Sequence, residues 1–540
     1  MNATAAVLPN SSTSAARPNL DNGLGEVGLY GFLAVMVAGL GFVGYSIYSD
    51  ATAAGVQSIT FLPFVMLFLA LLIALGFEFV NGFHDTANAV ATVIYTNSLP
   101  ANVAVVWSGF FNFLGVMAST GAVAFGIVSL LPVELILQVG GQAGFAMVFA
   151  LLIAAIIWNL GTWYLGIPSS SSHTLIGSII GVGVANALMH GRAGTAGVDW
   201  DQATKIGEAL LFSPLIGFGA ALLLFVSTKA VVRLPSLYKE PDGTTPPPLW
   251  IRGLLVLTCT GVSFFHGSND GQKGMGLIML ILIGIVPTAY ALNRAVPASY
   301  EAQYHSSAVA AVGVFSAHNQ AGAAPTVDAA RAEVTQYIAV HKFTPTTMAA
   351  MAVLSTDIDK QVASYGSLAK VPAAVTRNIR NDMYLTSSAL KRVAKEKTLA
   401  LNPAETATLD AYKKNLDKAT QFIPTWVKVA VAIALGLGTM IGWKRIVVTV
   451  GEKIGKTHLT YAQGAVAEVV AMATIGLADN YGLPASTTHV LSSGVAGTMA
   501  GNGSGLQMST LRALAIAWVL TLPVSIVLSG VLYVALSQII

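Results

Sequence analysis

Charged residues are scarce in this sequence. Lysine, arginine, aspartate and glutamate make up only 10% of its 540 residues, whereas a soluble globular protein contains about 25%. So few charges cannot cover the surface of a soluble protein of this length, which excludes a soluble enzyme. The net charge of +3 gives no basis for nucleic-acid binding. The composition therefore predicts an all-α polytopic protein embedded in the lipid bilayer.

Cysteine and the common catalytic motifs are also rare or absent. Cys259 is the only cysteine, so an internal disulfide and a cysteine metal cluster are excluded. The polar segments described below contain no HExxH, Walker A, GxGxxG or GxSxG motif, which argues against a metalloprotease, an ATP-driven pump and a serine hydrolase. We expect neither enzymatic activity nor a bound cofactor.

Long apolar runs, in contrast, are frequent. A membrane-spanning helix needs about 20 mostly apolar residues, and about ten to twelve such segments are expected here. The runs lie near residues 28–48, 61–80, 103–131, 143–166, 174–190, 206–228, 251–265, 274–291, 425–443, 461–478, 487–500 and 510–538. The polar residues 1–27 carry little basic charge, which favours a retained first helix over a cleaved signal peptide.

One segment differs in composition. Residues 292–424 contain 24 charged residues in 133, against 29 in the other 407, and we interpret them as a small helical soluble insert. Two short basic loops should be cytoplasmic by the positive-inside rule. These loops contain Lys229, Arg233, Lys239 and Arg252, and Lys444, Arg445, Lys453 and Lys456. This orientation places the insert in the periplasm.

Two pairs of motifs repeat along the chain. GFEFVNGFHDTAN (Gly76–Asn88) matches GVSFFHGSNDGQK (Gly261–Lys273) at an offset of 185 residues, and GIPSSSSH (Gly166–His173) matches GLPASTTH (Gly482–His489) at an offset of 316. The offsets differ by 131 residues, close to the length of the insert. Without the insert, both halves have the same motif spacing. The sequence therefore predicts two homologous halves with broken or re-entrant helices, a plan of secondary transporters.

This duplication defines the expected domain order. It is a tail (1–27), an extra helix and loop (28–60), the first repeat (61–228), a cytoplasmic linker (229–250), the first part of the second repeat (251–291), the insert (292–424) and the remainder of the second repeat (425–540).

Asp85 and Asp270 each lie inside an apolar run. A carboxylate at membrane depth costs on the order of 3 kcal/mol to insert, so it generally faces a cavity and binds something. An aspartate that only stabilises a helix break is the alternative. Gly82 and Gly267 are expected to let the chain break just before each aspartate.

The hydroxyl clusters Ser169–Ser172 and Ser486–Thr488 each follow a proline and precede an apolar run. Hydroxyl donors beside the unpaired N–H groups of a helix start favour an anion site. Ordinary N-capping is the alternative. The candidate anion ligands are Ser170, Ser171, Ser172, Ser486, Thr487 and Thr488.

Two carboxylates repel an anion unless a proton, Na⁺ or a divalent metal such as Mg²⁺ accompanies it. The pattern therefore predicts cation-coupled anion uptake. Lys273 occupies the position that matches Asn88 in the first repeat, where a fixed ammonium would replace a bound cation and favour H⁺ over Na⁺. A lysine that snorkels to the interface is the alternative.

Further polar residues lie near these motifs. Four histidines are candidate proton relays or neutral groups that orient the chain: His84, His173, His266 and His489. Glu468 and Glu78 are additional carboxylates at membrane depth, and Asn112 is a candidate coupling ligand or a helix–helix hydrogen bond. A passive anion channel is the competing class, but paired carboxylates in duplicated halves favour alternating access.

Five long motifs resemble the PiT-type inorganic phosphate transporters, in particular their bacterial low-affinity branch. They are NGFHDTANAVATVIYT (Asn81–Thr96), IIWNLGTWYLGIPSSSSHTLIGSIIG (Ile156–Gly181), SFFHGSNDGQKGMGLIMLILIG (Ser263–Gly284), GTMIGWKRI (Gly438–Ile446) and GLPASTTHVLSSGVAGTM (Gly482–Met499). The resemblance covers roughly residues 61–540.

The resemblance implies phosphate uptake by an inverted-repeat transporter of the bacterial cytoplasmic membrane. Phosphate would lie between the hydroxyl clusters and the Asn/Asp motifs, which contain Asp85, Asn88, Asn269 and Asp270. Symport with protons is implied, often of a metal–phosphate complex that Asp85 and Asp270 would hold. Na⁺-coupled members carry an Asn-type residue at Lys273 and tend to carry Glu at Asn112. Both departures favour H⁺, although Na⁺ coupling, sulfate as the cargo and a homodimer stay open.

Overall fold

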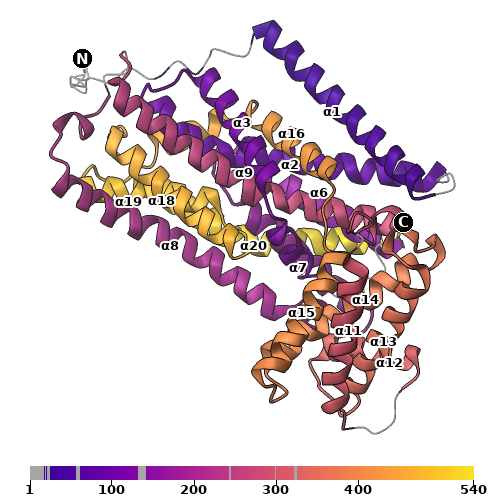
Figure 1. Ribbon diagram of the computed structural model, residues 1–540. Helices are drawn as coiled ribbons and strands as arrows, with labels where there is room; N and C mark the ends of the chain where they lie inside the picture. The colour runs from indigo at the N-terminus through magenta and orange to yellow at the C-terminus, as the bar shows by residue number, and fades with distance from the viewer. Residues whose placement is uncertain are drawn as a thin grey trace, which may run out of the picture.

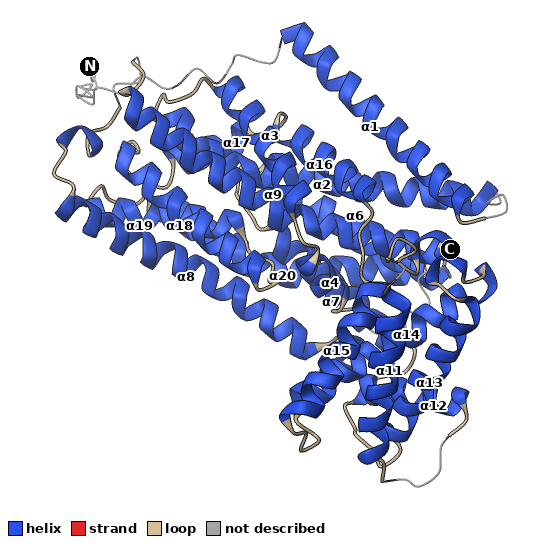
Figure 2. Ribbon diagram, in the orientation of Figure 1, coloured by secondary structure: helices blue, strands red, loops and turns tan. Residues whose placement is uncertain are grey.

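The computed structural model describes residues 18, 20, 25–55, 61–131, 142–241, 245–297, 299–320 and 325–539. Over these residues the chain is helical apart from turns, loops and one isolated β-bridge. Long apolar helices form one bundle, and a smaller group of helices stands at one end of it (Figures 1 and 2). Most of the predicted tail 1–27 lies outside the described residues.

The membrane unit consists of two halves. The first contains α1 (Gly25–Ala53), α2 (Phe61–Tyr95), α3 (Ala101–Ala118), α4 (Ala122–Val128), α6 (Gln142–Tyr164), α7 (Ser171–Met189) and α8 (Trp200–Val231). The second contains α9 (Leu249–Ile285), α10 (Pro287–Tyr290), α16 (Thr425–Thr439), α17 (Lys444–Glu452), α18 (Tyr461–Asn480), α19 (Thr487–Asn502) and α20 (Met508–Leu536). Nine of the described helices are long and apolar enough to cross a membrane, which confirms the all-α polytopic fold class.

Helices of one half pack on helices of the other in matching pairs. The short helices that follow the hydroxyl clusters are exchanged, because α7 packs along α20 and α19 packs along α8. In the same way α2 packs on α16, and α9 packs on α3. The long partners α8 and α20 each contain an internal proline, Pro214 and Pro523. This reciprocal arrangement is what the duplicated motifs predict for two homologous halves.

The predicted helix breaks at Gly82 and Gly267 are wrong. Both α2 and α9 continue through these glycines, and the runs 251–265 and 274–291 form the single helix α9. A Cβ on Gly82 would lie 2.2 Å from Leu435 O, and a Cβ on Gly267 would lie 2.1 Å from Asn112 O. The glycines therefore let two helix backbones touch, while an unbroken helix keeps its backbone hydrogen bonds within the membrane.

Residues 292–424 contain five helices outside the apolar bundle. They are α11 (Tyr300–Ala317), α12 (Val327–Val340), α13 (Thr347–Tyr365), α14 (Ala373–Glu396) and α15 (Pro403–Thr420). Their buried side chains form a hydrophobic core drawn only from residues 292–419. Arg331 on α12 donates two hydrogen bonds to Asp382 on α14, of 2.7 and 2.8 Å. The segment thus has its own core and its own cross-links.

The insert and the basic loops lie at opposite ends of the bundle. Lys395 of the insert pairs with Asp201 in the first turn of α8 (2.6 Å). Lys229, in the last turn of α8, donates to Asn502 Oδ1 (2.8 Å). The backbone of Lys456, in the second basic loop, bonds the loop that follows Asn502. Since α8 has 32 residues, its two ends are about 48 Å apart.

Candidate functional site

Asp85 on α2 and Asp270 on α9 meet at the centre of the membrane unit, and both are buried. The Ser171 hydroxyl lies between them, 2.5 Å from Asp85 Oδ2 and 3.3 Å from Asp270 Oδ2. The structure thus joins two carboxylates from different halves through one hydroxyl group. Sequence reasoning placed Ser171 among the anion ligands and missed this bridging position.

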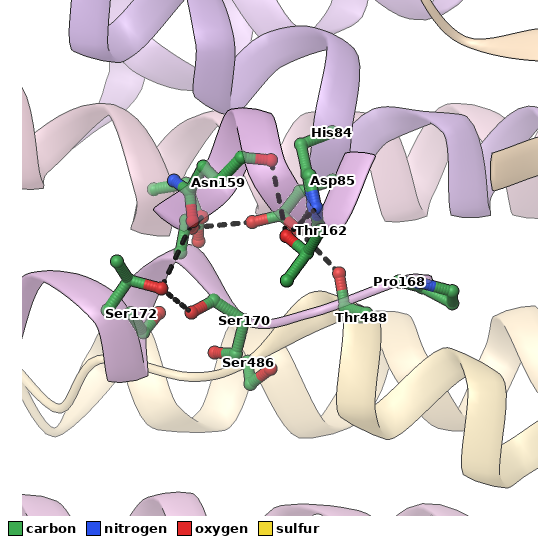
Figure 3. A network of polar contacts seen from close by, with 12 residues as sticks. His84, Asp85, Asn159, Thr162, Pro168, Ser170, Ser172, Ser486 and Thr488 are labelled. Atoms are coloured by element: carbon green, nitrogen blue, oxygen red, sulfur yellow. Dashed lines mark hydrogen bonds and ion pairs between the residues drawn. The ribbon is translucent and has the colours of Figure 1, made fainter. Parts of the chain in front are cut away.

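The starts of α7 and α19 converge on Asp85. Ser171 is the first residue of α7, and the Thr488 hydroxyl, in the first turn of α19, donates to Asp85 Oδ1 (2.5 Å). Figure 3 shows Asp85 between Thr488 on one side and His84 and Thr162 on the other. Helix N-termini carry unpaired N–H groups and a positive dipole end. This location therefore stabilises negative charge.

Lys273 is fully buried and forms an ion pair with Asp270 Oδ2 (2.5 Å). It does not snorkel to the interface. A carboxylate of the first half, Glu78, also interacts electrostatically with Lys273 and Asp270. Glu78 fits there because the facing residue is Gly274, where a Cβ would lie 2.5 Å from Glu78 Oε1. The ammonium thus lies among carboxylates from both halves.

His266 connects Asn112 to the aspartates. Its Nδ1 lies 2.6 Å from Asn112 Oδ1, and its Nε2 lies 3.6 Å from Asp270 Oδ2. Because an amide oxygen only accepts, Nδ1 carries the hydrogen and Nε2 presents a lone pair in the neutral ring. Ligand atoms of Asp85, His266 and Asp270 all lie within 4.8 Å of one another. These three side chains can hold a proton or a small cation.

The other three histidines take two different positions. His84 contacts Asp85 Oδ1 through Nδ1 and Thr162 Oγ1 through Nε2, both at 3.2 Å. The rings of His173 and His489 face each other with centroids 4.6 Å apart. The described residues provide no hydrogen bond between either of these two rings and an aspartate. Of the four candidate relays, His84 and His266 therefore contact the carboxylates.

Several predicted ligands bond the chain itself. Ser170 and Ser486 cap α7 and α19 by accepting from the N–H groups of His173 and His489, which is the N-capping alternative. Ser172 donates to Ala485 O (2.8 Å).

Asn269 is used in a similar way. Its amide donates to Leu483 O and accepts from Ala485 N, each at 3.0 Å. It thus fixes the loop before α19. The side chain of its predicted partner Asn88 lies outside the described residues.

Thr487 differs from the other cluster members. Its hydroxyl is buried and has no hydrogen-bond partner among the described residues. The corresponding position in the first half is Ser171, whose hydroxyl bonds the aspartates. One repeat thus uses this hydroxyl on the protein, while the other repeat leaves it available to a ligand.

Glu468 lies in a separate buried position between three helices. It accepts hydrogen bonds from Thr92 on α2 and Thr258 on α9, and it is fully buried. It has no recorded hydrogen bond to Asp85 or Asp270 within the described part of the chain. A coupling role for Glu468 stays a prediction.

A further polar network was missed from the sequence. Asp479 accepts from Ser268 (2.6 Å) and Gln272 (2.7 Å), and Gln272 Oε1 accepts from Val123 N (2.9 Å). These bonds link α18, α9 and the start of α4 on one side of the aspartates. Gln272 lies within the repeated Asp motif, so its position in that motif was the available signal.

A family model described as the phosphate transporter family matches residues 81–529. The chain belongs to this family. The low-affinity inorganic phosphate transporter PitA of Escherichia coli K12 is 43% identical over 485 residues, which cover 87% of this chain and 96% of that protein. PitB of the same organism is 41% identical over 508 residues, covering 91% and 98%. The predicted family is therefore confirmed.

A solved structure of a sodium-dependent phosphate transporter also matches, with a TM-score of 0.50 and 20% identity, covering 88% of this chain and all 100% of that one. At this identity the likeness concerns the fold. Membership of the phosphate transporter family, together with the nine apolar helices, confirms a multi-pass protein of the bacterial inner membrane. The matched relatives are transporters and not enzymes, as the sequence predicts.

Proposed function

We propose that this protein takes up inorganic phosphate across the cytoplasmic membrane by symport with protons. The observation that carries the proposal is the contact between two buried carboxylates and the hydroxyl-bearing starts of α7 and α19. The names of the relatives PitA and PitB support phosphate as the cargo.

The charges at the site support a positive companion. Asp85 and Asp270 contribute two negative charges, and Lys273 contributes one positive charge. Phosphate brings one or two more negative charges at neutral pH. An uncompensated charge in a buried site costs several kcal/mol, so a cation must enter with phosphate. Protons on the carboxylates or His266 supply it, and a divalent metal carried as a metal–phosphate complex is the alternative.

Cation binding would also release the phosphate ligands. Ser171 and Thr488 both donate to Asp85, so in this state Asp85 occupies the donors that phosphate needs. A proton or a metal ion on Asp85 weakens its hold on both hydroxyls. Phosphate oxygens then accept from them, from Thr487 and from the N–H groups of the two helix starts. The two halves would rock around the loaded site and release both ions to the cytoplasm.

The direction of uptake follows from the two ends of the bundle. The loops around Lys229 and Lys456 lie together at the end farthest from the insert. Since basic loops stay in the cytoplasm, we place the insert on the periplasmic side. Phosphate would reach the aspartates from the insert side.

Purified protein in liposomes should accumulate labelled phosphate when a proton gradient is imposed. A gradient of about one pH unit supplies about 1.4 kcal/mol per proton, so we expect about tenfold accumulation per coupled proton. An equal Na⁺ gradient should have no effect, and external Mg²⁺ should stimulate uptake if a metal complex is carried. Uptake driven by Na⁺ alone would replace proton coupling, and equilibration without accumulation would indicate a channel. Competition by sulfate would identify a broader oxyanion carrier.

Replacement of the unpaired hydroxyl, Thr487→Val, should raise the KM for phosphate by about tenfold. Valine preserves the shape, but a buried site that lacks one hydrogen bond to its ligand loses about 1–2 kcal/mol. Thr474→Val is the matched control, because the Thr474 hydroxyl bonds Val470 O within its own helix. Equal KM values for both variants would remove Thr487 from the binding site.

A further inference from the structure

A cavity of about 390 Å³ lies between the insert and the membrane unit. It is bounded by α12, α14 and α15 of the insert and by α4, α8 and α9 of the membrane unit. Six lysine and arginine side chains line it, against two aspartates: Lys205, Arg380, Lys391, Arg392, Lys395 and Lys413, with Asp199 and Asp201. This lining favours anions.

Ion pairs account for only half of these cations. Arg392 pairs with Glu396 (2.9 Å), Lys395 with Asp201 (2.6 Å) and Lys413 with Asp417 (2.5 Å). Asp199 caps α8 by accepting from Gln202 N (3.1 Å) and also attracts Lys391. Within the described part of the chain, Lys205, Arg380 and Lys391 have no ion pair. The cavity therefore keeps an excess of positive charge.

Arg380 is the buried member of this group. Its side chain is only 4% exposed, its guanidinium lies 4.9 Å from the Tyr384 ring centre, and its Nη1 donates to Asn381 Oδ1 (3.3 Å). Its Nε is buried and has no partner among the described residues. Burial lowers the pKa of Arg380 to about 10, so the group remains charged at neutral pH. A buried guanidinium with an unused donor is suited to bind an oxyanion.

The inner wall of the cavity lies close to the aspartate site. It includes Gly276 on α9, which is six residues, or about 9 Å along the helix axis, beyond Asp270. Ala122 on α4 also lines it. The hydrogen bond from Val123 N to Gln272 Oε1 joins α4 to α9 between this wall and Asp270. The cavity thus lies just outside a closed contact on the insert side.

We propose that this cavity is an outer anion-binding vestibule, in which Arg380 and Lys391 hold free inorganic phosphate before it passes α4 to the aspartates. The assignment rests on the proposed phosphate uptake and gives a function to residues 292–424. The phosphate of an acidic lipid head group has the same chemistry, so the test must separate the two sources.

The test is the initial rate of labelled phosphate uptake over a range of concentrations at low ionic strength. Arg380→Gln and Lys391→Gln proteins are compared with wild type in liposomes made only of neutral phosphatidylcholine. Each should raise the KM about five- to tenfold with kcat nearly unchanged, and high salt should shrink the difference by screening. Arg380→Lys should recover part of the loss. Lys360→Gln is the control, since Lys360 is an exposed lysine of the insert outside the cavity.

An unchanged KM in both glutamine variants would overturn the vestibule, as would an effect that appears only when acidic lipid is added. Lys391 is on the exposed rim, so its variant provides the answer even if Arg380→Gln does not fold. A second measurement does not need transport: inorganic phosphate should slow acetylation of Lys391 in the purified full chain, but not that of Lys360. Absence of uptake by the wild type would refute the proposed function, whereas absence of this protection would refute the vestibule.

Discussion

Asp85→Asn and Asp270→Asn proteins are each expected to lose at least about 100-fold of the initial rate of phosphate uptake. Disrupting a buried, charge-paired group costs about 3–5 kcal/mol, and a loss of 2.7 kcal/mol corresponds to about 100-fold. Asp270→Asn leaves the Lys273 ammonium without the carboxylate 2.5 Å away. Asp85→Asn removes the charged acceptor of Ser171 and Thr488. Uptake into proteoliposomes under a proton gradient measures both effects.

Asp410→Asn is the control for these variants, because Asp410 is an exposed carboxylate on α15 of the insert. It should transport at the wild-type rate. The residual uptake of the Asp85 and Asp270 variants should also lose its dependence on the proton gradient. If both variants kept rapid uptake that still followed this gradient, the carboxylates would have no coupling role.

Gly267→Ala should destabilise the folded membrane unit more than any other conservative change described above. The added Cβ would lie 2.1 Å from Asn112 O and 2.8 Å from Asn112 C, so α9 and α3 must move apart. Overpacking of this kind costs about 1–3 kcal/mol, and we expect the apparent melting temperature in detergent to fall by about 5 °C. Uptake should fall as well, because the displaced Asn112 bonds His266.

Gly253→Ala provides the matched control on the same helix, since a Cβ on Gly253 meets nothing within 4 Å. It should preserve or slightly raise stability, because alanine favours a helix more than glycine does. Equal melting temperatures for the two variants would show that the α9–α3 contact is looser than the structure indicates.

The sequence was sufficient to predict the helices and the meeting of the two motifs. Apolar runs mark the helices, and the repeat at offsets of 185 and 316 residues led us to pair Asp85 with Asp270. It was not sufficient to interpret Gly82 and Gly267. A glycine in an apolar run is compatible with a helix break and with a close helix crossing. Only the position of the facing backbone, at Leu435 or Asn112, distinguishes the two.

The roles of the polar residues were harder to predict for a similar reason. Ser170 and Ser171 are neighbours of one type, but one caps its own helix and the other bridges two aspartates. Asn269 fixes a loop that is more than 200 residues away in the chain. Lys273 is internal because α9 carries it to the centre of the bundle, and no local pattern distinguishes that position from a snorkelling lysine.

The exchanged packing of α7 on α20 and of α19 on α8 constrains how the site can open. Each hydroxyl-led helix is mechanically tied to the opposite half, so neither half can tilt while leaving its counterpart undisturbed. A displacement of α8 drags Thr488 away from Asp85, and a displacement of α20 does the same to Ser171. Disengagement of the two hydroxyls is therefore a concerted event, with the molecule working like a pair of interlocked hooks.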